Sequence, residues 1–154
     1  PPRSTLFPYT TLFRSGFRVQ LKELATKNKA GKALLSLPKN SAVLRPAIVG
    51  SETDQVAVVT QQGRLLVFPI AELPVLSRGK GNKLIQILSK DLATNSDAVV
   101  SVLSLPEDTS LKILSGKRHL TLKPVDLEHY CGNRARRGLF LPRGFQRVDG
   151  LLVE

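Results

Sequence analysis

The fold is decided by the run GRLLVFPIAEL at residues 63–73 and by the loop RGKGNK at residues 78–83 that follows it. In this stretch a glycine opens an apolar run, an acidic residue precedes a leucine, and the next loop combines glycines with cations. The same order recurs around Leu24 and Leu127, and a repeat of roughly 40 to 50 residues is typical of a propeller blade or a comparable β unit. The pattern predicts a repeat protein with one cationic loop in each repeat.

Outside that stretch the apolar residues mostly follow the period of a β-strand. Phe17, Val19 and Leu21 alternate with polar residues, which predicts a half-buried strand with Arg18 on its polar face. Short branched runs bounded by turn residues predict further strands. These lie at 33–37, 42–44, 48–49, 56–60, 65–68, 84–88, 98–105, 111–114, 120–122 and 151–153.

Helical structure is expected only in two short segments, 70–73 and 125–130. Many short strands at regular spacing favour an all-β, propeller-like array of about three blades, with a β-sandwich as the alternative. An open array of blades leaves unpaired strand edges. We therefore expect the first blade to fray or to associate with another molecule.

Residues 1–15 do not follow the repeat pattern. The triplet TLF occurs in them twice, and they lack the features of a secretory signal. We interpret residues 1–15 as a foreign or disordered leader, such as a translated adapter, in which little could be paired. Residues 16–154 are then the folded domain.

The balance of charge favours a polyanionic partner. The chain has 23 Lys and Arg against 12 Asp and Glu, a formal net charge of +11. No apolar run is long enough to cross a bilayer and no basic amphipathic helix stands out, so a membrane is not expected as the partner. Nucleic acid fits this composition better.

The residue types that carry most chemistry are scarce or isolated. Cys131 is the single cysteine, and His119 and His129 have no ligand partners at suitable spacing, so no metal site is predicted. Glu23, Glu72 and Asp126 recur at the spacing of the repeat rather than as a facing pair. We expect these acids to fix adjacent turns and not to act in general acid–base catalysis.

The cationic loops suit phosphate binding. Glycines in the 78–83 loop let the backbone approach a ligand closely, while ammonium and guanidinium groups supply charge. The spacing of a nucleotide-binding P-loop is absent. Equivalent loops of stacked repeats lie along one rim, so we expect a continuous DNA-binding track. Its members are Lys27, Lys29, Lys32, Arg78, Lys80, Lys83, Arg134, Arg136 and Arg137.

Such a track would bind duplex DNA through its backbone without reading sequence, because no recognition helix, zinc finger or aromatic platform is evident. Two alternatives stay open. A β-repeat module for acidic protein surfaces would carry the same charge, whereas a hydrolase or transferase would need a convergent polar site that the sequence does not display.

Three segments resemble one known family. GKALL at 31–35, the 63–83 stretch and GKRHLTLKP at 116–124 resemble the C-terminal domain of the A subunit of bacterial DNA topoisomerase IV. The resemblance covers essentially residues 16–154. It implies a β-pinwheel, a propeller-like disc that binds and bends duplex DNA on its basic rim and guides the transported segment in supercoil relaxation and decatenation. The gyrase heptapeptide QRRGGKG is absent, and SRGKG at 77–81 matches it only in part.

The resemblance also implies where the remaining functions lie. In that family the DNA-cleaving tyrosine is in an N-terminal region, and neither Tyr9 nor Tyr130 matches its motif, so this chain alone should not cut DNA. ATP and Mg²⁺ would be bound elsewhere in the ATP-dependent enzyme, and no cofactor is expected here. The B subunit of topoisomerase IV and a second copy of the A subunit would be the partners, in the bacterial cytoplasm at the nucleoid.

Overall fold

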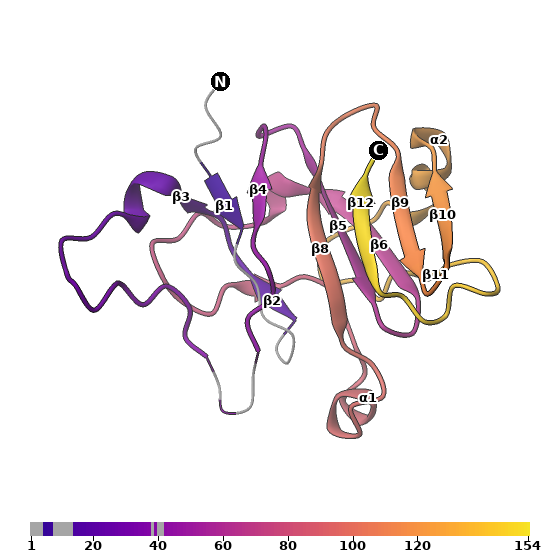
Figure 1. Cartoon of the computed structure of the whole chain (residues 1–154), viewed down its shortest axis with the longest axis horizontal. Helices are drawn as coiled ribbons and strands as arrows, with labels where there is room; N and C mark the ends of the chain where they lie inside the picture. The colour runs from indigo at the N-terminus through magenta and orange to yellow at the C-terminus, as the bar shows by residue number, and fades with distance from the viewer. Residues whose placement is uncertain (1–4, 8–13, 38, 40–41) are drawn as a thin grey trace.

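The structure, a computed structural model, describes residues 5–7, 14–37, 39 and 42–154 (Figure 1). These residues form short strands in four sheets, joined by turns and short helices. All strand pairs within the sheets are antiparallel. The prediction of an all-β fold is confirmed.

The central sheet has four strands in the order β11-β6-β5-β8. They are β11 (Leu139–Phe140), β6 (Arg64–Pro69), β5 (Gln55–Thr60) and β8 (Val99–Leu105). The turn between β5 and β6 sets the register, with Val59 opposite Leu65 and Val56 opposite Phe68. The chain reaches this sheet from three separate stretches, which ties distant parts of the sequence together.

Three smaller sheets surround it. One has the order β3-β1-β4, a second β10-β9-β12, and a third pairs β2 with β7. Their strands are β1 (Thr5–Phe7), β2 (Ser15–Gly16), β3 (Val19–Gln20), β4 (Ala47–Val49), β7 (Asn82–Lys83), β9 (Leu111–Ser115), β10 (Arg118–Leu122) and β12 (Gly150–Val153).

The two middle strands of the central sheet, β5 and β6, are buried on both faces. Alternate side chains of β5 and β6 enter two different hydrophobic clusters: Val58 and Phe68 lie in one, and Val59 and Leu65 in the other. All four are fully buried. This explains why VAVV at residues 56–59 and LLVF at residues 65–68 are continuous apolar runs, since a strand covered on both sides has no polar face. Burial of such apolar area stabilises the fold at about 25 cal/mol per Å².

The short helices differ partly from expectation. The two predicted segments are helical, as η2 (Ile70–Glu72) and as α2 (Pro124–Leu127) followed by η3 (Glu128–Tyr130). The prediction that helices are confined to them is wrong, because η1 (Leu21–Leu24) and α1 (Ser89–Ala93) are also present.

Several expected strands are instead extended loops. Residues 84–88 contain no strand, and 33–37 and 42–44 contain only single bridge positions. Leu84, Ile85 and Ile87 are nevertheless buried. Their apolar run therefore reports burial between sheets and not strand pairing, a distinction that periodicity alone cannot make.

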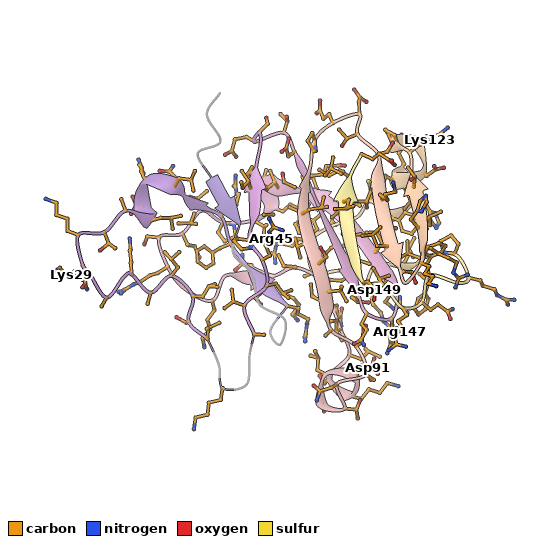
Figure 2. All side chains as sticks on the ribbon, viewed as in Figure 1. Lys29, Arg45, Asp91, Lys123, Arg147 and Asp149 are labelled. Atoms are coloured by element: carbon orange, nitrogen blue, oxygen red, sulfur yellow. The ribbon has the colours of Figure 1, made fainter. Side chains whose placement is uncertain are left out.

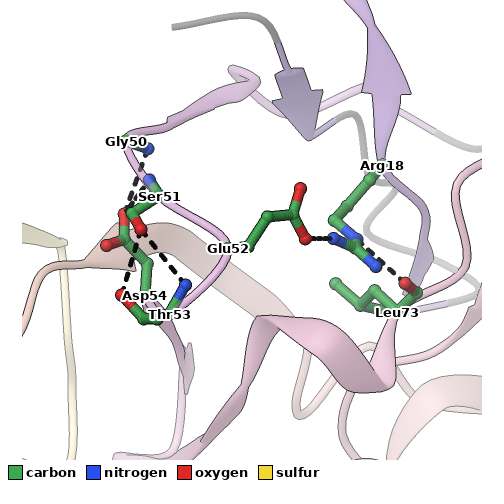
Figure 3. Close-up of polar contacts among 7 residues, drawn as sticks. All are labelled: Arg18, Gly50, Ser51, Glu52, Thr53, Asp54 and Leu73. Carbon is green, nitrogen blue, oxygen red and sulfur yellow. Dashed lines mark hydrogen bonds and ion pairs between the residues drawn. The ribbon is translucent and has the colours of Figure 1, made fainter. Parts of the chain in front are cut away.

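The alternation predicted for the first repeat also fails in part. Phe17 and Val19 are buried as expected, but Leu21 is exposed and Arg18 is buried. The Arg18 Nε donates to the backbone carbonyl of Leu73 at 2.9 Å, and its guanidinium contacts the Glu52 carboxylate (Figure 3). Arg18 is therefore a link between two repeats, satisfied by partners on another part of the chain.

The interpretation of residues 1–15 as unpaired is wrong where the structure describes them. Thr5–Phe7 is the middle strand of a sheet, between β3 and β4, and Ser15 pairs with Lys83. The rest of the predicted leader, apart from Arg14, lies outside the described residues. Whether the segment is foreign stays a prediction.

Candidate nucleic-acid interface

The site begins with a crossing between the first two repeats. After η2 the chain leaves the central sheet and runs parallel to the first repeat, where Val75 pairs with Arg18 and Gly79 pairs with Leu35. The Gly79 amide donates to the carbonyl of Leu34 at 2.9 Å. The first cationic loop is at residues 27–32. This crossing brings the 78–83 loop against Leu34 and Leu35, which closely follow that first loop.

The third repeat crosses to the second in the same way. After η3 the chain pairs Cys131 with Val67 in a parallel bridge. The Ala135 amide then donates to the carbonyl of Leu84 at 2.9 Å, as Gly79 does to Leu34. The third cationic loop, at residues 134–137, therefore lies against Leu84, which directly follows the 78–83 loop.

Each crossing ends in a return strand that begins at a glycine. Gly81, with a φ of 73°, precedes β7, which pairs with β2; Gly138, with a φ of 72°, precedes β11, which pairs with β6. A Cβ on Gly81 would lie 2.2 Å from the carbonyl oxygen of Gly16, and one on Gly138 would lie 2.7 Å from that of Leu65. Both positions need glycine, for backbone conformation and for space.

These contacts join the three loops in chain order. The segment that follows the first loop accepts a hydrogen bond from Gly79 of the second loop, and the segment that follows the second loop accepts one from Ala135 of the third. We call the nine predicted cations the cationic track: Lys27, Lys29, Lys32, Arg78, Lys80, Lys83, Arg134, Arg136 and Arg137. Eight are exposed, and Arg134 is half-buried. Lys29 extends from the end of the molecule opposite Lys123 (Figure 2).

Arg134 has a role that the sequence did not indicate. Its guanidinium donates to the carbonyl oxygens of Lys83, at 2.6 Å, and of Glu72, at 3.1 Å. Its backbone amide also donates to the Glu72 carboxylate at 2.8 Å. Arg134 and Glu72 therefore fix the third loop to the second repeat.

The other recurring acids also contact turns. The Asp126 carboxylate accepts the backbone N–H of Lys123 at 3.0 Å, at the start of α2. Glu23 lies 3.9 Å from the Lys32 ammonium, which donates to the Glu23 carbonyl at 2.6 Å. The expectation that these acids fix adjacent turns is confirmed for Asp126, whereas it is wrong for Glu72, whose carboxylate accepts the backbone N–H of the distant Arg134. Lys32 is partly engaged by its own repeat.

Sequence reasoning did not find Arg64. Its guanidinium lies 3.8 Å from the ring centroid of Phe140 and donates to the carbonyl of Gly138 at 3.1 Å. Burial lowers the pKa of Arg64, and the charge of Arg137 lowers it further. The arginine stays charged near neutral pH. Arg64 therefore adds positive charge beside the third loop.

A further group of cations surrounds a depression of about 640 Å³ beside the β9–β10 turn. Lys117, Arg118 and Arg147 line it together with Asp149. The Arg118 guanidinium donates to the carbonyl of Gly144 at 3.1 Å. No repeat pattern predicts this group, because the turn and the 143–149 segment meet only in the folded chain.

The described residues contain no cluster of His, Cys, Asp and Glu suited to a metal ion, and none of their helices is long and apolar enough to cross a membrane. Burial raises the pKa of the Cys131 thiol, whose Sγ donates to the carbonyl of Leu127 at 3.4 Å. A raised pKa lowers the thiolate fraction at neutral pH.

The repeated crossings and the four sheets define a class of β-propeller domain in which neighbouring blades exchange strands. Residues 54–106 match the family model described as DNA gyrase C-terminal domain, beta-propeller. The solved structure titled "Structure of DNA gyrase A C-terminal domain" matches 97% of this chain with a TM-score of 0.76 at 18% identity. The prediction of a propeller-like β-pinwheel is confirmed.

Closer matches specify the family. The chain is 49% identical over 155 residues to the A subunit of DNA topoisomerase 4 from Pseudomonas aeruginosa, covering all of this chain and 21% of that protein. It is 40% identical over 139 residues to the Escherichia coli K12 protein of the same name, covering 90% and 18%. The E. coli ParC C-terminal domain structure matches with a TM-score of 0.86 and 38% identity, over 98% of this chain and 60% of that one.

The chain thus belongs to the family of C-terminal domains of the topoisomerase IV A subunit, as the sequence resemblance indicated. It spans about a fifth of the length of the curated relatives that it matches.

Proposed function

We propose that this chain binds duplex DNA along the cationic track, without reading its sequence, as part of a type II topoisomerase. The observation that carries the proposal is the pair of crossings that joins three cationic loops in chain order. Eight of the nine cations in these loops are exposed, and the formal net charge of the chain is +11. Phosphate contacts from such side chains give affinity and set the position of the protein on the duplex.

The bound duplex is bent, because it must follow loops that belong to successive repeats of a curved array. Bending 20–30 base pairs by 40–90° costs about 1–6 kcal/mol, which additional phosphate contacts offset. In the parent enzyme this contact would guide the transported segment toward the DNA gate. We extend the proposal to its surroundings: the B subunit of the enzyme, a second copy of the A subunit, ATP and Mg²⁺ held elsewhere, and a cytoplasmic location at the nucleoid.

The test is a fluorescence-anisotropy titration of the full chain with duplex DNA at several salt concentrations. The track variant carries Arg78→Ala, Lys80→Ala and Lys83→Ala. The matched control carries Lys39→Ala, Lys90→Ala and Lys123→Ala, which remove three exposed cations outside the loops. We expect the track variant to lose affinity for all sequences alike and to reduce the salt slope by about 1 for each lost phosphate contact.

The control variant should keep most of the affinity and the slope. Equal losses in the two variants would mean that net charge, and not the track, determines binding. Absence of duplex binding by the unaltered chain, together with saturable binding to an acidic protein, would favour the protein-binding alternative. Bending is measured separately, as a decrease in the end-to-end distance of a doubly labelled duplex.

A further inference from the structure

Phe140 has an exposed aromatic ring at the edge of the cationic track. Its side chain is 51% exposed, although it lies in β11 of the central sheet. The ring is held in place by backbone pairing with Arg64 and by the Arg64 guanidinium, 3.8 Å from its centroid. Along the chain, Gly138 before Phe140 fits tightly against the backbone of Leu65, and Leu141 after Phe140 is buried. The ring is therefore accessible, and the Arg64 guanidinium and the backbone pairing constrain its position.

The repeat gives this position a meaning. Phe140 pairs with Arg64 at the start of β6, and Lys83 pairs with Ser15 of β2 in the equivalent return strand. Phe140 and Lys83 therefore occupy matching positions in successive repeats. Where the second repeat places a cation of the track, the third places an aromatic ring.

The surroundings of the ring favour a nucleic-acid ligand. Arg136 and Arg137 are exposed just before β11, and Arg64 covers the ring on one side. A planar apolar group among cations suits a ligand that is aromatic and anionic, since a nucleotide offers a base for stacking and a phosphate for the arginines. Single exposed apolar side chains are common on protein surfaces; the equivalence to Lys83 and the neighbouring arginines distinguish this one.

We propose that Phe140 is a stacking contact for an unstacked nucleobase at a kinked or mismatched step of the bound duplex. This inference rests on the proposed function, because the track must bring the duplex to the ring. Apolar side chains inserted at a base step can kink a duplex, and a mismatched base costs least to unstack. The contact would make this chain prefer deformable or mismatched sites, a preference that phosphate contacts alone do not provide.

The chain contains no tryptophan, so Phe140→Trp introduces a single fluorescent reporter at the site. The control is Val125→Trp, since Val125 is 69% exposed on α2, outside the track. Each variant of the full chain is titrated with a duplex that carries one central mismatch and with the matched duplex. Anisotropy of labelled DNA reports binding, and tryptophan emission reports stacking.

We expect the mismatched duplex to quench Phe140→Trp emission strongly, and Val125→Trp emission to stay unchanged. Phe140→Ala should weaken binding to the mismatched duplex by about 5- to 150-fold, the range for loss of one base–aromatic stack, and matched-duplex binding less. Phe140→Leu should behave like the alanine variant, whereas Phe140→Tyr should keep the preference. Circular dichroism checks that the variants are folded.

The outcomes separate the two proposals. Binding by anisotropy without quenching of the Phe140→Trp emission, or equal losses for both duplexes in Phe140→Ala, would overturn the stacking contact and leave the track intact. Absence of any binding by the unaltered chain would overturn both. If Phe140→Ala is unfolded, the Phe140→Tyr and Phe140→Trp variants decide the matter.

Discussion

The first and second repeats share a sequence pattern but differ in what covers them. Leu73 is buried in the cluster beside the central sheet, whereas its counterpart Leu24 is only partly buried and lies in neither cluster. Gly81 fits against the backbone of Gly16, but a Cβ on Gly31 would meet nothing within 4 Å. The same residues thus have different surroundings, depending on whether another segment crosses over them.

The difference shows that a repeat of this kind is completed by its neighbour. Cluster residues near Leu73, including Leu84 and Ile85, come from the chain that follows the second loop. Repeat architectures derive much of their stability from such contacts between adjacent units. The first repeat should therefore be less stable locally than the second and the third.

The largest expected effect concerns Leu73 and Leu24, the leucines that follow the recurring acidic residue in the second and first repeats. Leu73→Ala should lower the free energy of unfolding by about 2–5 kcal/mol, because it removes a fully buried side chain and leaves a cavity. Leu24→Ala should cost clearly less, since its side chain is partly exposed. Urea denaturation followed by circular dichroism measures both. Equal costs would show that the two repeats are equally well packed.

The next comparison concerns the glycines of the cationic loops. Gly31 and Gly81 have similar positive φ angles, 83° and 73°. An alanine at either position would be held in the left-handed region, which costs about 1–2 kcal/mol of stability. Only Gly81→Ala also drives a Cβ into the Gly16 carbonyl. We expect a larger fall in Tm for Gly81→Ala, measured by calorimetry. A similar fall in both variants would contradict the tight crossing.

Arg134 and Arg137 allow a structural cation of the third loop to be compared with one that is only proposed to bind DNA. Arg134→Ala should cost about 1–2 kcal/mol of stability, because two carbonyl oxygens lose a charged donor. Arg137→Ala, at an exposed position, should change stability by less than about 0.5 kcal/mol and reduce the salt slope for duplex binding by about 1. Chemical denaturation and DNA titration measure the two quantities. A stable Arg134→Ala variant would show that the third loop is held by backbone contacts alone.

The smallest effect concerns how the stability of the β10-β9-β12 sheet depends on pH. Hydrogen bonds from Lys112, at 3.1 Å, and from Thr121, at 2.9 Å, lower the pKa of Glu154. The folded pKa is below the unfolded value, so the stabilisation is present above the unfolded pKa and is lost as pH falls through the folded pKa. Glu154→Gln should flatten this acidic part of the stability profile. A profile unchanged by Glu154→Gln would exclude the contribution.

Sequence reasoning found most of the central architecture. The VAVV and LLVF runs became β5 and β6, and the predicted helical segments became η2 and α2 with η3. It failed where burial arises from another part of the chain. The run 84–88 is apolar because it lies between sheets, and Arg18 is buried because Leu73 and Glu52 supply its partners.

The candidate interface was predicted in the same uneven way. Recurrence of glycine and cations was enough to locate all three loops. It could not distinguish Arg134, which fixes the crossing, from Arg137, which is exposed. It also could not find Arg64 and Phe140, since they come together only through the pairing of β6 with β11.

The sequence alone determined the period of the repeat, the strands β5, β6 and β8 of the central sheet and the positive charge of the loops, because these depend on local patterns of apolar residues, glycines and cations. The tertiary structure decided which loops lie side by side, which cations are engaged as structural links and which aromatic ring is exposed among them. Those properties depend on contacts between residues some 50 or more positions apart, such as Arg18 with Leu73 and Arg134 with Glu72. Local patterns cannot encode such contacts, because chain crossings and not neighbouring residues create them.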